Sequence, residues 1–387
     1  HQLGVPPSSC SLLASFLESA HYRLRTGLGL SQEYYSTSDG KYLHGPGQGS
    51  REGPCLWLVV STLAMDTMPV GASPIYFTDP YCKHKSTRYL DGYVDDTTTW
   101  FNTFDASLQH GDDINQLAAG LRQSAQWWES LLAVTGGALE LSKCFYYLIT
   151  FRFTREGKPV MVLPQDSNAH PIYLKDHTSN TTSKITQKPC SETHKTLGVM
   201  QTPDLSSAGE IKRLHTKVTA IAKRLLPMRL SAEETWVYIH TTFRPSVCWS
   251  APVSNISRIQ WNKIQQPAVR IFLNNLGYPV SFPRAVVFAP ICDGGVGIPH
   301  GFSEQGTQHI DFLLFHLNTP GPVRKLLQIT LDWAQRYSGF SLSMLAYPNL
   351  PVDHVPAPWI RTTLHHLELS KCKVHYPIGC LASPQRV

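Results

Sequence analysis

This 387-residue chain has no run of about 18 uninterrupted apolar residues, the length that a membrane-spanning helix requires. Its most apolar stretch, CLWLVVSTLAM, is shorter and contains Ser61 and Thr62. The sequence also has no secretory signal, no internal repeat and no low-complexity tract. These absences favour an ordinary globular protein without a membrane span.

The nine cysteines are scattered, and none of them forms a CxxC pair. This pattern predicts free thiols in a reducing compartment, so we expect an intracellular protein of the cytoplasm or nucleus that is not secreted. The chain begins with His1 rather than Met. This start favours a processed product or a fragment of a longer reading frame.

Charged residues are scarce as well, at 16% of the chain, whereas hydrophobic residues make up 42%. This balance is typical of a folded chain, and the length is sufficient for two or three domains. The formal net charge of +6 allows a nucleic-acid partner without requiring one.

Hydrophobic periodicity predicts both helices and strands. Helices are expected after Pro54, over 112–134, from Ser206 onward, and near 255–276, 303–318, 321–338 and 358–369, with Ser231 and Glu234 as a capping box. Two short strands are expected within 86–101 and a longer one over 139–153. The polar region 154–195 indicates a loop or a loose hairpin.

Asp95 and Asp96 stand side by side in DGYVDDTTTW, between residues typical of strands. Adjacent carboxylates repel each other, and Asp is a poor strand former. A tight turn between two strands explains the pair structurally. A divalent metal that needs both charges explains it chemically. The pair by itself leaves both explanations open.

Three further short motifs surround this pair in a definite order. Gln48-Gly49 lies in a glycine-rich loop before Pro54, Gly136-Gly137 precedes Lys143, and Leu197-Gly198 precedes a basic helical region. From about residue 1 to about residue 275 this succession resembles the palm of reverse transcriptases, the RNA-directed DNA polymerases of retrotransposons. The resemblance implies an α+β fold, with an antiparallel palm sheet packed on helices. It assigns an incomplete palm with part of the fingers to 1–204, a helical thumb to 205–276 and a helical C-terminal extension to 277–387.

The resemblance also implies a catalytic centre. Asp95 would bind metal directly and Asp96 would support the site, with two Mg²⁺ ions (Mn²⁺ is an alternative) clamping the primer 3′-hydroxyl and the triphosphate. Lys143 would neutralise or protonate the leaving pyrophosphate. An ordinary Asp-Asp turn and a solvated lysine are the plain alternatives.

Substrate contacts follow from the same resemblance. Gln48 and Gly49 would lie against the incoming deoxynucleotide and the template base, where a side chain at position 49 would clash. Tyr93 and Val94 would lie near the primer end, and Leu197-Gly198 would form the primer grip. A glycine loop before a helix and simple packing are the alternatives for the Gln-Gly motif and for Val94.

The helical region after Ser206 carries an excess of positive charge. Such helices suit a surface that follows a phosphate backbone without reading bases, although a solvated helical face is the alternative. The expected partners are an RNA or DNA template with its primer, and deoxynucleotides, with no membrane. The candidate nucleic-acid-binding residues are Lys212, Arg213, Lys217, Lys223 and Arg224.

A third catalytic carboxylate, which the family carries upstream of its Gln-Gly motif, is missing. The only acids within 1–47 are Glu18, Glu33 and Asp39, and none has the expected neighbours. We therefore expect the chain to begin after its first catalytic aspartate and to be inactive by itself. Two alternatives stay open. One is a non-catalytic nucleic-acid-binding remnant, and the other is a viral-type RNA-copying RNA polymerase, which usually has Gly where this chain has Val94.

Overall fold

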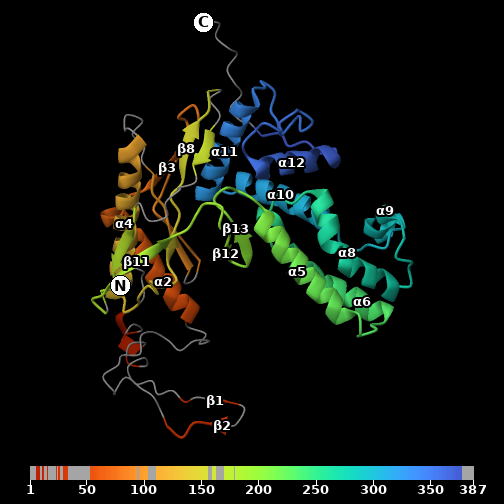
Figure 1. Ribbon diagram of the computed structural model, residues 1–387, viewed down its shortest axis with the longest axis horizontal. Coiled ribbons are helices and arrows are strands. Elements are labelled where there is room, and N and C mark those ends of the chain that lie inside the picture. The colour runs from red at the N-terminus through yellow and green to blue at the C-terminus, as the bar shows by residue number, and fades with distance from the viewer. Residues whose placement is uncertain are drawn as a thin grey trace. The chain divides into compact units, whose positions relative to one another are not determined.

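A computed structural model describes residues 6–8, 11–12, 15, 23, 25–26, 29–33, 53–93, 96–102, 110–155, 159–162, 170–177 and 179–376. The protein is a mixed α+β chain with small antiparallel sheets, as expected (Figure 1). It divides into two compact units. Unit 1 comprises His1–Ile75, Arg88–Tyr146 and Asn168–Thr186, and unit 2 comprises Tyr76–Thr87, Tyr147–Ser167 and Gln187–Val387.

Unit 1 is organised around the long helix α4 (His110–Val134), which confirms the helix expected over 112–134. Its buried Trp128 and Leu132 pack against the apolar faces of α2 (Gly53–Asp66) and α3 (Met68–Gly71). Gly71 is required at this contact, because the ring of Trp127 occupies the space in which a side chain would stand.

The strands of unit 1 form three small sheets: β1 pairs with β2, β5 pairs with β6, and a three-stranded sheet has the order β10-β11-β7. Their bounds are β1 (Arg25–Thr26), β2 (Gly29–Leu30), β5 (Leu90–Tyr93), β6 (Asp96–Thr99), β7 (Phe145–Tyr146), β10 (Ile172–Lys175) and β11 (Thr182–Gln187). The antiparallel hairpin β10–β11 is more regular than the loop or loose hairpin expected over 154–195. Ile172, Leu174 and Ile185 are buried and alternate with exposed polar residues, so the strand pattern was hidden by an overall polar composition.

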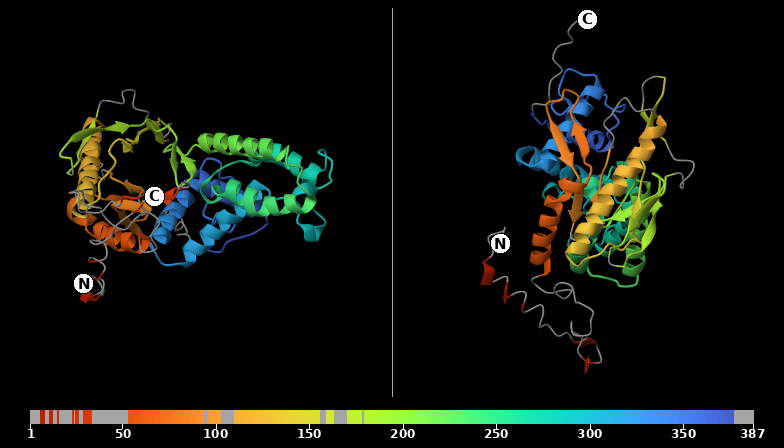
Figure 2. Two further views of the ribbon diagram at one scale, coloured as in Figure 1. Left: turned by 90° about the horizontal axis from the view of Figure 1, so that it is seen from below. Right: turned by 90° about the vertical axis from the view of Figure 1, so that its left-hand side faces the viewer.

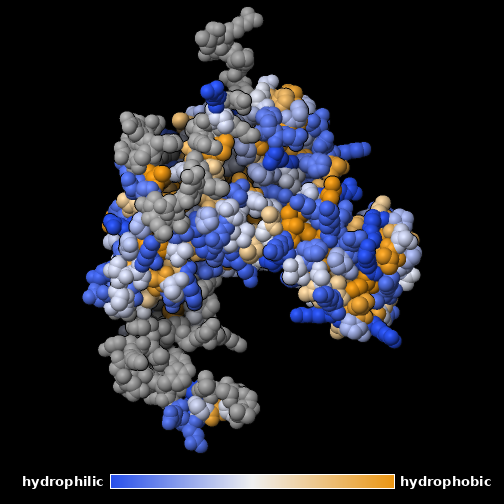
Figure 3. Space-filling view, viewed as in Figure 1, coloured by the Kyte–Doolittle hydropathy of each residue, from blue (hydrophilic) through white to orange (hydrophobic). Residues whose placement is uncertain are grey.

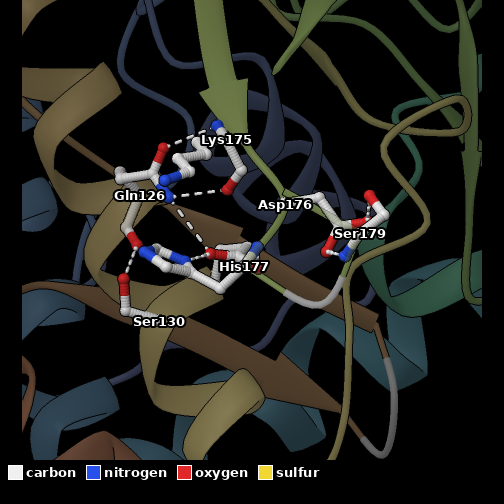
Figure 4. Close-up of polar contacts among 7 residues, drawn as sticks. Gln126, Ser130, Lys175, Asp176, His177 and Ser179 are labelled. Atoms are coloured by element: carbon white, nitrogen blue, oxygen red, sulfur yellow. Dashed lines mark hydrogen bonds and ion pairs between the residues drawn. The ribbon is translucent and has the colours of Figure 1, made fainter. Parts of the chain in front are cut away.

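Polar side chains of α4 fasten this hairpin (Figure 4). The Gln126 amide accepts a hydrogen bond from the Lys175 N–H and donates one to the Lys175 carbonyl, both at 2.8 Å, as a neighbouring strand would. The buried carboxylate of Glu129 accepts the backbone N–H of His177 at 3.0 Å and also contacts its Nδ1. These bonds attach one end of β10 to the helix.

Unit 2 is mainly helical, and α5 and α8 lie side by side in it (Figures 1 and 2). Its helices are α5 (Ala208–Leu225), α6 (Ala232–Tyr238), η2 (Ile239–Phe243), α7 (Arg244–Cys248), η3 (Ala251–Val253), α8 (Arg258–Asn275), α9 (Arg284–Phe288), η4 (Ile291–Asp293), α10 (Gly301–Asn318), α11 (Pro322–Ser338) and α12 (Pro358–Leu369). The helices expected from Ser206 onward are confirmed, as is the capping box of Ser231 and Glu234. Its strands are β3 (Ile75–Thr78, from Tyr76 on), β4 (Lys85–Arg88, up to Thr87), β8 (Thr150–Phe153), β9 (Pro159–Val162), β12 (His194–Thr196) and β13 (Val199–Gln201).

The compact units divide the chain differently from the three expected ranges. Residues 205–276 and 277–387 share one core, in which Phe243 and Phe272 pack with Phe302 of α10. The buried amide of Gln305 reinforces this joint, because its oxygen accepts from the Ile256 N–H and from Trp261 Nε1, each at 3.1 Å. Two ranges with a common core belong to one folding unit.

The surface of the described residues is mixed in character. Within that part of the chain, no helix combines the length and the apolar character needed to cross a membrane. Hydrophobic side chains gather where α5 ends and α6 follows (Figure 3), and exposed Leu226, Met228 and Val237 lie there. The described cysteines are free thiols, as the sequence predicts.

Candidate nucleic-acid interface and acidic hairpin

The acid pair belongs to the hairpin β5–β6 of unit 1. Asp96 begins β6, is exposed, and pairs with Tyr93, the last residue of β5. This register leaves two residues between the strands, the connection that is commonest in β-hairpins. The two short strands expected around the pair are therefore confirmed. Val94 and Asp95 lie outside the described residues.

The hairpin is held to its surroundings by neighbours of the acid pair. Asp91 of β5 accepts a 2.9 Å hydrogen bond from Trp100 Nε1 and forms an ion pair with Arg88. The side chain of Met65, from α2, fills the space in which a side chain on Gly92 would stand. Asp91 is thus already engaged in structural contacts, and it does not replace the missing third acid.

The carboxylates of Asp95 and Asp96 are oxygen donors, which is the ligand type that Mg²⁺ takes. Within the described part of the chain, no group of three or more His, Cys, Asp or Glu residues lies together as a metal site. Asp95 lies outside that part, so a metal at the acid pair stays a prediction. Gln48 and Gly49 lie outside the described residues, so their position beside the hairpin stays a prediction.

Lys143 lies in an exposed turn between α4 and β7, and not at the start of a strand. Its N–H donates to the carbonyl of Glu140 at 2.9 Å, and the Ser142 hydroxyl donates to the Glu140 carboxylate at 2.5 Å. The strand expected over 139–153 is therefore wrong for 139–144. Local side-chain and backbone bonds compete with strand pairing there.

Leu197-Gly198 forms the two-residue turn of the hairpin β12–β13 in unit 2. Both residues have positive φ, +50° for Leu197 and +85° for Gly198, as a type I′ turn requires. Glycine adopts this conformation readily, whereas leucine does so at a cost. Trp249 Nε1 donates a 2.9 Å hydrogen bond to the Leu197 carbonyl and holds the turn in place.

A pocket of about 560 Å³ adjoins this turn, and we call it the basic pocket. It combines three cationic side chains with three hydroxyl groups and an exposed indole, all from unit 2. Its lining residues are Lys195, Gly198, Arg213, Lys217, Thr241, Thr242, Pro245, Ser246 and Trp249.

The charges of the basic pocket are not equivalent. Arg213 donates two hydrogen bonds, of 2.8 and 2.6 Å, to the buried carboxylate of Glu210, which also accepts the Met200 N–H. Burial is the largest single effect and raises the pKa of Glu210, but the hydrogen bonds that Glu210 accepts, first those from Arg213, together with the charge of Arg213 hold that pKa below its usual value. Glu210 therefore balances the charge of Arg213.

Lys195 and Lys217 form no ion pair within the part of the chain that the structure describes. Lys217 Nζ donates to the Ser246 carbonyl at 2.5 Å, and Lys195 is exposed on β12. Burial, followed by the nearby charge of Arg213, lowers the pKa of Lys217. An anion in the pocket would relieve this repulsion, so the site is suited to phosphate.

The hydroxyl groups reach the pocket through an irregular helix. Thr241 and Thr242 lie in η2, which has π-helical winding, and Pro245 follows in α7. Proline has no N–H to donate to the carbonyl four residues before it, so the ordinary α-helical ladder is broken at Thr241. Such π segments occur frequently at functional sites.

The structure brings together only part of the predicted basic set. Arg213 and Lys217 line the basic pocket, whereas Lys212, Lys223 and Arg224 are exposed elsewhere on α5. Sequence reasoning missed Lys195 and Trp249. Lys195 stands two residues before Leu197, so the turn motif was a usable signal for it; Trp249 is brought to the turn by the fold alone.

No family model matches this chain, and no curated protein matches it either. The relation to reverse transcriptases therefore stays an expectation from the motifs.

Proposed function

We propose that this chain is the palm and thumb portion of a retrotransposon-type reverse transcriptase, a nucleotidyltransferase that adds deoxynucleotides to a primer. The observation that supports the proposal most directly is the pairing of Tyr93 with Asp96, since Asp96 begins a strand at the turn end of a short hairpin. The order of the motifs along the chain supports it. The basic pocket beside Leu197-Gly198 supports it independently.

In this proposal the acid pair is the metal-binding end of the active site. Asp95 and Asp96 would hold Mg²⁺, which stabilises negative charge on the reacting phosphate when it is bound. Gln48, Gly49, Tyr93 and Val94 would line the nucleotide and primer end. Lys143 is exposed, and it would neutralise or protonate the leaving pyrophosphate.

Unit 2 would hold the nucleic acid. The basic pocket would offer the ammonium groups of Lys195 and Lys217 and the hydroxyl of Thr242 to a phosphate backbone, and none of these groups reads a base. The hydroxyls of Thr241 and Ser246 already donate to the carbonyls of Val237 and Phe243. The Leu197-Gly198 turn would contact the primer, and Lys212, Lys223 and Arg224 would extend the positive surface along α5.

A second candidate is a nucleic-acid-binding protein that does not catalyse. The observation favouring it is that no acid within residues 1–47 has the neighbours expected of the first catalytic aspartate. A viral-type RNA polymerase ranks below both, because Val94 stands where such enzymes usually carry Gly.

Primer extension separates these candidates. The chain as given is expected to extend no primer with Mg²⁺ or Mn²⁺. A fusion that supplies an aspartate-bearing strand ahead of residue 1 is expected to gain template-dependent extension, which Asp95→Asn removes. Asp66→Asn is the control, because this acid lies at the end of α2 in the same unit. Binding of primer–template without extension by any fusion would favour the non-catalytic candidate.

A further inference from the structure

Unit 2 carries a second basic surface, on α11 and the β3–β4 hairpin, which we call the aromatic–basic patch: Tyr81, Lys83, Trp333, Arg336 and Tyr337. The rings of Trp333 and Tyr337 lie 6.1 Å apart between centroids. Arg336 lies 6.0 Å from the Tyr81 centroid, and the Lys83 ammonium lies 5.6 Å from it. The side chains thus form two groups, Trp333 with Tyr337 and Tyr81 with its two cations, and Arg336 and Tyr337 are consecutive residues of α11.

The patch has a rigid support. Trp333 Nε1 donates a 2.7 Å hydrogen bond to the Thr78 carbonyl, which attaches the hairpin to α11. The buried carboxylate of Asp79 accepts the backbone N–H groups of Tyr81 at 3.0 Å and of His84 at 2.5 Å. The turn that carries Tyr81 and Lys83 is therefore held in one conformation.

Packing of the β3–β4 hairpin against α11 does not bury all of the aromatic surface of the patch. Trp333 is 40% exposed and Tyr337 is 44% exposed, although each ring would gain free energy by burial. The acid closest in sequence to Tyr81, Asp79, is buried and occupied by backbone donors. Lys83 and Arg336 form no ion pair among the described residues, and open aromatic surface beside such cations is complementary to a polyanion that offers flat apolar rings.

We propose that the aromatic–basic patch binds single-stranded RNA or DNA, with bases stacked on Trp333 and Tyr337 and phosphates beside Lys83 and Arg336. A duplex keeps its base faces stacked on one another, so it offers only phosphates to this surface, whereas a single strand offers both groups. The patch shares no residue with the basic pocket, so this proposal stands independently of the polymerase function.

The test uses the full chain and a labelled oligothymidylate of about 20 nucleotides, a length that exceeds the site sizes usual for such surfaces. Fluorescence anisotropy is expected to show that Tyr337→Ala weakens binding by about 5- to 150-fold. Tyr347→Ala is the matched control, because Tyr347 is also 44% exposed and also lies near a lysine, Lys373, at 5.6 Å. It is expected to bind as the wild type does.

Two further variants separate loss of binding from loss of folding and from binding at the basic pocket. Tyr337→Leu preserves apolar packing and removes the stacking face, so it is expected to weaken binding even if Tyr337→Ala unfolds. Lys195→Gln with Lys217→Gln should weaken primer–template binding by a larger factor than oligothymidylate binding, because stacking on Trp333 and Tyr337 remains. Absence of oligothymidylate binding, equal effects at Tyr337 and Tyr347, or a larger loss of single-strand binding than of primer–template binding in the Lys195/Lys217 variant would each overturn the proposal. The first of these results would favour a protein partner for the patch.

Discussion

Trp249 Nε1 donates a 2.9 Å hydrogen bond to the carbonyl of Leu197, although the two residues are 52 positions apart in the chain. The bond connects the end of α7 with the turn of β12–β13. A single indole therefore fixes one wall of the basic pocket relative to another. The bond also stabilises Leu197 in the left-handed conformation that leucine rarely adopts.

Leu197→Asn is expected to stabilise the β12–β13 hairpin, because Asn-Gly is the preferred pair for a type I′ turn. The gain should be about 0.5–1 kcal/mol, measured as the free energy of unfolding in urea. Gly198→Ala should be destabilising by about 1 kcal/mol or more, since Gly198 has φ +85° and lies against Trp249. An unchanged unfolding midpoint in both variants would contradict the turn assignment.

Lys195→Gln combined with Lys217→Gln is expected to weaken primer–template binding and to reduce its dependence on salt. Each lost phosphate contact should lower the slope of log K against log salt by about 0.9. Filter binding at several salt concentrations measures this slope. Lys371→Gln, an exposed lysine outside the pocket, should leave it unchanged. Arg213 is unsuitable for this test, because its removal leaves buried Glu210 without its partner.

Glu129→Leu is expected to loosen the β10–β11 hairpin in unit 1. The substitution leaves the His177 backbone N–H without its acceptor, at a cost of about 2–3 kcal/mol. Hydrogen exchange of the amides in β10 should report this opening. Ser179→Ala, which alters only an exposed turn contact, is the comparison. Equal protection in both variants would contradict a fastening role for Glu129.

Unit 2 is expected to lose stability in mild acid. Burial is the main cause that lowers the pKa of His300, His309 and His366 from 6.5 to about 4, with smaller contributions from nearby positive charge. The unfolded chain takes up these protons near pH 6.5, whereas the folded chain takes them up only near pH 4. The free energy of unfolding is therefore highest above pH 6.5 and decreases as the pH falls from 6.5 to 4.

The slope in that window should be up to about 1.4 kcal/mol per pH unit for each histidine, measured by urea unfolding across the window. His366→Phe removes one of the three titrating groups, and the His366 Nε2 that it replaces has no hydrogen-bond partner. The variant should therefore show a shallower dependence on pH. If the pH dependence of the free energy of unfolding in the variant equals that of the wild type, groups other than His366 cause the loss of stability in acid.

Local sequence patterns were sufficient to predict many of the helices and strands. The apolar stripe of 112–134 predicted α4, and Ser231 with Glu234 predicted the start of α6, because helix periodicity and capping depend on residues within one or two turns. The strands flanking Asp95-Asp96 were predicted for the same reason. The predicted strand was wrong at Glu140–Lys143, because local side-chain and backbone hydrogen bonds there favour a turn over strand pairing.

The sequence by itself determined the α+β class, the helices of unit 2 and the two short strands β5 and β6. Only the tertiary structure decided which distant residues meet. Trp249 reaches Leu197, Lys195 joins Lys217, and Trp333 reaches Thr78 across 255 positions. These contacts depend on how helices and hairpins pack, and packing is set by the summed burial of many side chains. A periodic pattern in one segment records that it has a buried face, and it does not record which segment covers that face.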